Sequence, residues 1–404
     1  MLTASAPLSD WLTWLETLSP KEIDLGLERV RSVLSRLSLR LPEHILLIGG
    51  TNGKGSSVAT SAGLLAAAGY RFGAYTSPHV TDFNERIVVN AVTASDATIT
   101  SALQRVEEAR DDLPLTYFEF GTLAAMVVFA DADLDVWLLE VGMGGRLDAT
   151  NVIDPTASLI TNVSLDHCDW LGDDIETIAV EKAGIMRAGV PTVFASADVP
   201  RSIPKQADEK SATLLLAGRD FKFNVRDDGR WDWSGQRSVL ENLPPSGLRG
   251  AFQYQNAAAV LALLDAAGLE QALEKDMVNQ ALPGLQLQGR MQSVSVGNRN
   301  WLLDVAHNPA AAEKLAETLH AGQNSITGNG RTWAIVGLLD DKDVEGVARA
   351  LDSRVDDWIA VTANSARAVP AEELARRVAN ACGRPCRIIA HLEDAIQFAQ
   401  RAAS

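Results

Sequence analysis

Residues 49–57 read GGTNGKGSS, and this stretch decides how the chain around it should fold. The apolar run before it, HILLI at 44–48, predicts a short buried strand. Residues 58–68 after it are small and compatible with a helix. A strand, a glycine-rich turn, a lysine and a helix make up a phosphate-binding loop, where backbone N–H groups and the helix N-terminus attract an anion. We therefore expect Lys54 to reach the outer phosphates of a nucleoside triphosphate.

This loop departs from the usual phosphate-binding pattern in two places. Ile48 stands where a glycine is expected five positions before Gly53, and Gly55 separates Lys54 from Ser56. The alternative is a glycine-rich turn without a ligand, which the order Gly-Lys-Gly-Ser between a strand and a helix disfavours. The stretch by itself indicates nucleotide binding and leaves the reaction open.

The composition of the whole chain narrows the class of protein. With 404 residues, two domains are expected, and 47% hydrophobic with 22% charged residues is typical of a globular protein. A net charge of −16 argues against nucleic acid or an anionic membrane surface as a partner. Three cysteines make neither a disulfide framework nor a four-ligand zinc site, so we expect a cytoplasmic protein. We find no signal-peptide pattern and no apolar run near the roughly 20 residues of a membrane span.

Strands and helices alternate along the chain, which predicts an α/β fold with a mainly parallel sheet. The pattern restarts near residue 288, so we expect a larger domain at 1–288 and a smaller α/β domain at 289–404. In the first part, strands are expected at 44–48, 71–76, 135–141, 157–163 and 191–194, a hairpin at 221–240, and helices near 8–18, 97–111, 119–131, 174–187, 252–267 and 270–279.

Polar side chains stand at the ends of several predicted strands of the first part. Ligands of open α/β sheets bind beyond the carboxyl ends of the strands. A strand order that brings these ends together would therefore make one site. The residues concerned are Lys54 and Ser56, Ser77 and His79, Glu140, and Asp166 and His167.

The roles of three residues stay open when each is taken alone. A buried Glu140 needs a cation, which is either magnesium, with Ser77 as a further oxygen ligand, or the guanidinium of Arg146. His167 alone is expected to be a hydrogen-bonded structural histidine. Lys182 alone is expected on a solvated helix face, although its small apolar neighbours make it a candidate for a partly buried, reactive amine.

A further strand end lies in the second part of the chain, where residues 301–309 read WLLDVAHNP. This pattern puts Asp304 and His307 after a strand, and it makes Asn308 the N-cap of a helix that begins at Pro309. Arg290 is either an anion clamp or a surface charge, and taken alone the surface is favoured.

With these segments collected, the chain resembles the dihydrofolate synthase/folylpolyglutamate synthase family of the Mur ligase superfamily, from about residue 8 to 400. The resemblance implies a P-loop ATPase and pterin-binding domain followed by a smaller Rossmann-like domain. It also implies ATP-dependent ligation of L-glutamate to dihydropteroate, and to the γ-carboxylate of tetrahydrofolates, through an acyl phosphate. The motifs that carry it are GTNGKGS (50–56), SPHV with FNERI (77–87), LTYFEFGT (115–122), LEVGMGGRLDATN (139–151), SLDHCDWLG (164–172), EKAGI (181–185) and DVAHNP (304–309).

The resemblance also implies roles for individual residues. Two magnesium ions are implied, with Ser77, Glu140, His167 and an N-carboxylated (carbamylated) Lys182 as ligands, which overrides the structural reading of His167. The implied catalytic residues are Lys54, Lys182 and His307. The implied ATP contacts are Gly53, Lys54, Gly55, Ser56, Asn256, Arg290 and Asp304. The implied pterin contacts are Glu22, Ile23, Asp24, Leu25, Thr116, Tyr117, Phe118, Glu119 and Leu147.

The chain departs from the family pattern in three places. Ser56 and Ser57 stand where some members have paired threonines. Residues 283–290, PGLQLQGR, are longer than the usual Pro-Gly-Arg, which makes Arg290 less secure than Asp304. The sequence stops at Ser404, before a last strand and helix that the resemblance leads us to expect.

The sequence leaves three alternative functions to consider. A folylpolyglutamate synthase without the dihydrofolate synthase activity is the first alternative. A P-loop nucleotide switch is the second, but no Asn-Lys-x-Asp motif for guanine is present. A cell-wall peptide ligase of the same superfamily is the third, and the 48 residues before Gly49 are too few for its UDP-sugar-binding domain. We expect a monomer whose partners are small molecules.

Overall fold

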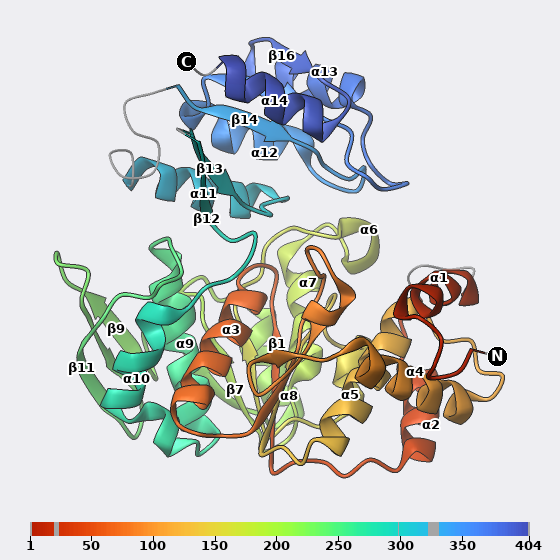
Figure 1. The fold of residues 1–404 in the computed structure, drawn as a ribbon. Coiled ribbons are helices and arrows are strands. Elements are labelled where there is room, and N and C mark those ends of the chain that lie inside the picture. The colour runs from red at the N-terminus through yellow and green to blue at the C-terminus, as the bar shows by residue number, and fades with distance from the viewer. Residues whose placement is uncertain (1, 20–23, 298, 322–330, 403–404) are drawn as a thin grey trace. The chain divides into compact units, whose positions relative to one another are not determined.

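The computed structural model describes residues 2–19, 24–297, 299–321 and 331–402, and Figure 1 follows the chain by colour. The chain forms two compact units. The first contains the residues up to Val163, Asp174–Gly247 and Tyr254–Gln286, and the second contains Ser164–Asp173, Leu248–Gln253 and the chain from Leu287 onward. Two short segments of the first 288 residues therefore fold with the second unit. The domain boundary at residue 288 stays a prediction.

The first unit is built on an eight-stranded sheet with the order β4-β3-β2-β5-β1-β6-β7-β8. The pairs from β2 to β8 are parallel, and only β3 and β4 run antiparallel at one edge. The predicted mainly parallel α/β sheet is confirmed. The strands are β1 (His44–Gly49), β2 (Phe72–Tyr75), β3 (Ile87–Val89), β4 (Val92–Thr93), β5 (Val136–Glu140), β6 (Ala157–Ile160), β7 (Pro191–Phe194) and β8 (Thr213–Leu216).

The central strands are buried along their length because helices cover the sheet. All of β5 and β2 is buried, and β1 is buried after its first residue, which is why these strands read as continuous apolar runs. The helices of this unit are α1 (Leu8–Leu18), α2 (Glu28–Leu37), α3 (Lys54–Ala67), α4 (Asp96–Arg110), α5 (Tyr117–Asp131), α7 (Ile175–Lys182), α8 (Ser202–Lys210), α9 (Phe252–Ala266) and α10 (Lys275–Ala281). The first two residues of α9 belong to the second unit.

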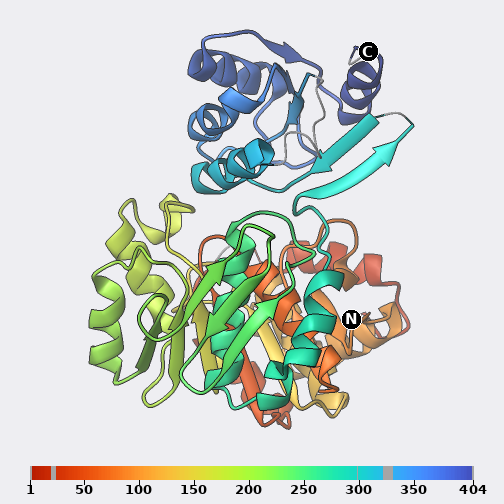
Figure 2. The same cartoon turned by 90° about the vertical axis from the view of Figure 1, so that its left-hand side faces the viewer.

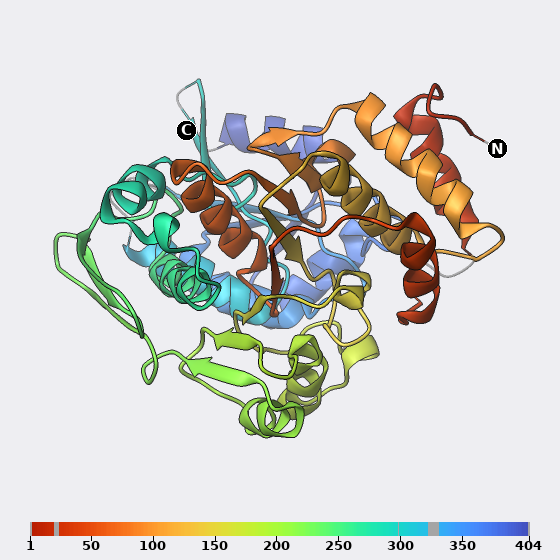
Figure 3. The ribbon, with the colours of Figure 1, turned by 90° about the horizontal axis from the view of Figure 1, so that it is seen from below.

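The region predicted as a hairpin forms a separate three-stranded antiparallel sheet of β9 (Lys222–Val225), β10 (Trp231–Ser234) and β11 (Val239–Leu243). Trp231 and Trp233 alternate along β10 and are both fully buried. The Trp233 indole N–H donates to the carbonyl of Ala258 on α9 at 3.0 Å, so this sheet is anchored on a helix. In Figures 2 and 3 the sheet, drawn in green, lies at the end of the unit away from α1 and the N-terminus.

The second unit contains an antiparallel pair, β12 (Gln292–Val296) and β13 (Arg299–Leu303), and a parallel sheet of β14 (Trp333–Val336), β15 (Asp357–Ala360) and β16 (Cys386–Ile388). Its core forms where Val344 and Val347 of α12 meet Leu374 and Val378 of α13 around Trp358. The expected smaller α/β domain is confirmed. Its helices are α6 (Cys168–Leu171), α11 (Pro309–Ala321), α12 (Val344–Leu351), α13 (Ala371–Cys382) and α14 (Leu392–Ala402).

Several elements were not predicted from the sequence, among them the edge strands β3 and β4. The segment SLDHCDWLG was given no helix or strand from the sequence, and it contains the short helix α6. Helix α8 leads to strand β8, which extends the parallel sheet beyond the last strand that we expected.

Within the described ranges, no helix is long and apolar enough to cross a lipid bilayer.

Candidate active site

The strand order brings together the four strand ends that carry polar residues. Strands β2, β5, β1 and β6 are immediate neighbours and run parallel, so their carboxyl ends lie along one edge of the sheet. Glu140, the last residue of β5, is level with Ile48 of β1, directly before the glycine-rich loop. The four strands are therefore neighbours, and the convergence of the polar side chains in one site stays a prediction.

The glycine-rich loop is held by the residues that follow β6. Gly50 has a φ of +138°, and a Cβ at this position would lie 1.8 Å from the hydroxyl of Thr161. The Thr161 hydroxyl donates to the carbonyl of Asn52 at 2.6 Å, and the amide N–H of Asn52 donates to the side-chain oxygen of Asn162 at 3.1 Å. Only glycine allows so close an approach, so the loop conformation depends on this position.

Lys54 begins α3 and folds back over the loop. Its ammonium donates to the carbonyls of Gly50 and Thr51, each at 3.0 Å. Gly53, the N-cap, has a φ of +88°, and a Cβ there would lie 2.9 Å from the amide oxygen of Asn256. Asn256 is only 6% exposed on α9, so the fold places this predicted ATP contact beside the loop.

Glu140 and Ser77 also meet at this edge. The Glu140 side chain is buried, and one of its carboxylate oxygens accepts the backbone N–H of Ser77 at 3.1 Å. Arg146, the alternative partner of Glu140, bonds the carboxylate of Glu181 at 2.9 Å. The choice between magnesium and Arg146 as the cation of Glu140 stays open.

The donor set at this edge fits magnesium. Glu140 offers a carboxylate and Ser77 a hydroxyl, and magnesium prefers oxygen ligands and keeps waters or phosphates in its shell. The described parts of the chain contain no group of three His, Cys, Asp or Glu side chains that could hold a metal by themselves. A magnesium ion held by Glu140 and Ser77 would share its shell with phosphate and water oxygens, as this ion usually does.

Lys182 is buried at the end of α7 and is only 3% exposed, so the solvated position expected from its isolated context is wrong. The loop after Glu140 packs directly against this helix end. A Cβ on Gly145 would lie 2.9 Å from the carbonyl of Glu181, and the Arg146 N–H donates to the same carbonyl at 2.8 Å. The close approach requires glycine and keeps Lys182 next to this loop.

The predicted pterin-binding segments are joined by one arginine. Arg29 bonds Asp24 at 2.8 Å and Glu119 at 2.9 Å. Glu119 also closes a capping box with Thr116, whose N–H it accepts at 2.8 Å at the start of α5. The Phe118 ring covers Gly142, where a Cβ would lie 2.5 Å from the ring, and Leu147 is half-buried. Glu22 and Ile23 lie outside the described residues.

Arg86 belongs to this region and was missed from the sequence, although FNERI was noted as a motif. It is 9% exposed, with its guanidinium over the rings of Phe83 and Tyr117, 5.4 and 5.6 Å from their centroids. Its Nε donates to Nδ1 of His79 at 2.8 Å. Burial first, and then the charge of Arg86, lowers the pKa of His79. His79 is therefore held as a neutral acceptor.

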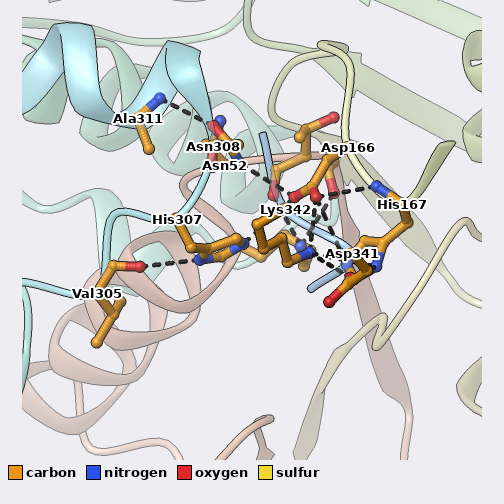
Figure 4. A network of polar contacts seen from close by, with 12 residues as sticks. Asn52, Asp166, His167, Val305, His307, Asn308, Ala311, Asp341 and Lys342 are labelled. Atoms are coloured by element: carbon orange, nitrogen blue, oxygen red, sulfur yellow. Dashed lines mark hydrogen bonds and ion pairs between the residues drawn. The ribbon is translucent and has the colours of Figure 1, made fainter. Parts of the chain in front are cut away.

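In the second unit, predicted site residues meet at one carboxylate, that of Asp166 (Figure 4). One of its oxygens accepts the side-chain amide N–H of Asn308 at 3.0 Å and lies 3.3 Å from Nε2 of His307. The other accepts from the ammonium of Lys342 at 2.9 Å. Burial alone would raise the pKa of Asp166, but His307, His167 and Lys342 together hold it well below its usual range. Asp166 therefore stays ionised.

The remaining predicted residues of this unit have local structural contacts. Asn308 caps α11 as predicted, because its side-chain oxygen accepts the N–H of Ala311 at 2.9 Å. Asp304 accepts the N–H groups of Met291 and Ala306 at 2.9 and 2.8 Å, which fixes the turn after β13. Arg290 is half-buried rather than fully exposed. The ATP contacts of Asp304 and Arg290 stay predictions.

The fold and the strand-end site define a P-loop ATPase unit joined to a second α/β unit, the architecture of the Mur ligases. The Mur ligase middle domain family matches residues 48–264, and the Mur ligase glutamate ligase domain family matches residues 289–404. A curated relative, the dihydrofolate synthase/folylpolyglutamate synthase of Escherichia coli (strain K12), is 42% identical over 378 residues, which cover 93% of this chain and 87% of that protein. The chain belongs to the dihydrofolate synthase/folylpolyglutamate synthase family.

Solved structures agree over the whole length. An E. coli FolC in complex with DHPP and ADP has a TM-score of 0.93 at 39% identity, covering all of this chain and 94% of the other. A bifunctional folylpolyglutamate synthase/dihydrofolate synthase with Mn, AMPPNP and L-glutamate bound has a TM-score of 0.90 at 39% identity, with the same coverage. The resemblance drawn from the motifs is thereby confirmed.

Proposed function

We propose that this chain ligates L-glutamate to dihydropteroate, and to the γ-carboxylate of tetrahydrofolates, with ATP converted to ADP and phosphate. Its membership of the dihydrofolate synthase/folylpolyglutamate synthase family supports ATP-dependent glutamate ligation to folates as the activity. The observation that carries the proposal is the neighbouring order of β2, β5, β1 and β6, since it puts the phosphate-binding loop beside Glu140 and Ser77. The nucleotides, DHPP and L-glutamate bound by the two solved relatives fit these substrates.

The chemistry explains why such a site needs a phosphate-binding loop. A carboxylate is a poor electrophile, and its oxygen leaves only after phosphorylation to an acyl phosphate. The amine of glutamate then attacks the acyl carbon, the C–O bond to phosphate breaks, and an amide forms. Lys54, Gly53, Gly55 and Ser56 would hold the triphosphate, and the Lys54 ammonium would offset the charge that moves with the phosphoryl group. In this scheme Asn256, Arg290 and Asp304 contact the nucleotide.

Metal binding is proposed for Ser77, Glu140 and His167. Magnesium would supply charge neutralisation for the phosphates at this site. The relative with manganese and AMPPNP supports a divalent ion. A second ion would require an anionic Lys182: its neutral amine adds to carbon dioxide, loses a proton and becomes a carbamate. The burial of Lys182 beside the loop that follows Glu140 supports this modification.

For the folate, we propose contacts with residues 22–25, Thr116–Glu119 and Leu147. The shared bonds of Arg29 to Asp24 and Glu119 support one site for these segments. For His307 we propose a nucleotide or phosphate contact. The three free thiols fit the reducing cytoplasm, which we keep as the proposed compartment, and we keep a monomer as the proposed state.

A phosphate-release assay tests the function. With Mg-ATP, we expect release only when glutamate is present together with dihydropteroate or a tetrahydrofolate. Phosphate release that does not depend on either substrate would refute the ligase activity and favour a nucleotide switch. Activity with tetrahydrofolate but none with dihydropteroate would limit the chain to folylpolyglutamate synthesis.

A further inference from the structure

Three segments of the second unit, far apart in sequence, are tied together at Asp166 (Figure 4). The first is the segment that carries Asp166 and His167, the second is the turn with His307 and Asn308, and the third is the turn with Asp341 and Lys342. The third segment contains none of the motifs found in the sequence. Only the folded chain brings it to the others.

Lys342 is the cation at the centre of this cluster. Its side chain is 7% exposed, and its ammonium lies 2.9 Å from a carboxylate oxygen of Asp166 and 3.1 Å from one of Asp341. Asp166 is equally buried. Without the ammonium, two carboxylates would face each other with little water, which is unfavourable because each buried charge would lack its partner. Lys342 therefore bridges the carboxylates of Asp166 and Asp341, while the other oxygen of Asp166 accepts from Asn308.

The same two residues face the ring of His167. Its Nδ1 lies 3.5 Å from the Lys342 ammonium and 3.8 Å from a carboxylate oxygen of Asp341. On the other side of the ring, Nε2 lies 4.0 Å from a carboxylate oxygen of Asp166. The charged groups of Asp341, Lys342 and Asp166 therefore surround the ring of His167 and set its orientation. Groups that orient a metal-binding histidine affect its affinity for the metal.

We propose that Lys342 is a positioning residue for the ligation reaction, acting with Asp341. It fixes the carboxylates of Asp166 and Asp341 against the rings of His307 and His167, so that one buried cation sets the orientation of both histidines. The inference rests on the proposed function for the roles of the two histidines. The roles of Lys342 and Asp341 themselves rest on the contacts above.

The test uses the full chain and needs no turnover. Mn²⁺ is titrated in the presence of AMPPNP and the free ion is measured by electron paramagnetic resonance. For Lys342→Met we expect the affinity for Mn²⁺ to fall about tenfold or more, as for other changes behind a metal ligand. Lys342→Arg keeps the charge and should restore most of the affinity. As a matched control, Lys314→Met removes an exposed lysine of α11 that is paired with Glu317 at 2.9 Å, and should change nothing.

A second measurement reports orientation directly. The chain has six histidines, so selective ¹⁵N labelling gives an imidazole spectrum in which His167 and His307 can be assigned by substitution. In Lys342→Met we expect both signals to move while those of His44 and His320 stay. If that variant does not fold, Asp341→Asn, which leaves no buried charge unpaired, should still move the His167 signal and weaken Mn²⁺ binding.

Unchanged Mn²⁺ affinity together with unchanged His167 and His307 signals, in either variant, would overturn the proposal. Failure of the proposed function would appear elsewhere, in the phosphate release of the unaltered protein. The two failures are therefore distinguishable.

Discussion

Substitution of Gly53 by alanine tests the geometry of the phosphate-binding loop. Gly53 has a φ of +88°, a left-handed conformation that costs an alanine about 1 kcal/mol. The added Cβ would also lie 2.9, 3.3 and 3.4 Å from the three outer side-chain atoms of Asn256. Because Asn256 is buried, its amide cannot simply swing into solvent.

Gly69, at the other end of α3, provides a matched control. Its φ is +79°, but a Cβ there meets nothing within 4 Å. Gly69→Ala should therefore cost only the backbone strain, about 1 kcal/mol. Gly53→Ala should cost about 1 kcal/mol more in unfolding free energy, because Asn256 must shift, and should weaken ATP binding about tenfold. Gly69→Ala should leave ATP binding unchanged.

Denaturant unfolding gives the first quantity, and the dependence of thermal stability on ATP concentration gives the second. The opposite result would be a Gly53→Ala variant that binds ATP as tightly as the unaltered chain and is as stable as Gly69→Ala. The contact between Asn256 and the loop would then contribute neither to stability nor to ATP affinity. The inference that Asn256 belongs to the nucleotide site would then lose its structural support.

Three further predictions follow from buried or paired charges. Lys182→Ala should nearly abolish turnover while ATP binding persists, with the exposed Lys205→Ala as control; a fully active variant would remove the argument for carbamylation. Arg86→Met should lower the free energy of unfolding by about 2 kcal/mol and raise KM for dihydropteroate, because His79 and Tyr117 lose their partner. The control is Arg105→Met, at an exposed arginine. Equal KM values for the two variants would contradict this prediction. Arg377 lowers the pKa of Glu345 from 4.5 to about 2, so this pair stabilises the chain above pH 4.5 and loses its effect as the pH falls toward 2. Glu345→Gln should therefore be less stable by about 0.5–1 kcal/mol near pH 7, given partial exposure, and the difference should vanish in acid unfolding curves near pH 2.

The sequence by itself determined the features that depend on neighbouring residues. The strand, turn and helix around GGTNGKGSS, the mainly parallel α/β architecture and the cap formed by Asn308 all follow from local hydrophobic pattern and backbone geometry. The ordered motifs were also enough to recognise the family, because they are read directly along the chain.

Only the tertiary structure determined which residues far apart in sequence are buried together or form ion pairs. Lys182 looks like a solvated helical lysine in its own segment, and its burial comes from the loop after β5 packing on α7. Arg29 pairs with Asp24, which is close in sequence, and with Glu119, which is not. No local sequence pattern indicates the second ion pair. Lys342 reaches Asp166 from 176 residues away. Burial and ion pairing are properties of the packed chain, where a charge is stabilised by whatever the fold brings to it, so local patterns do not encode them.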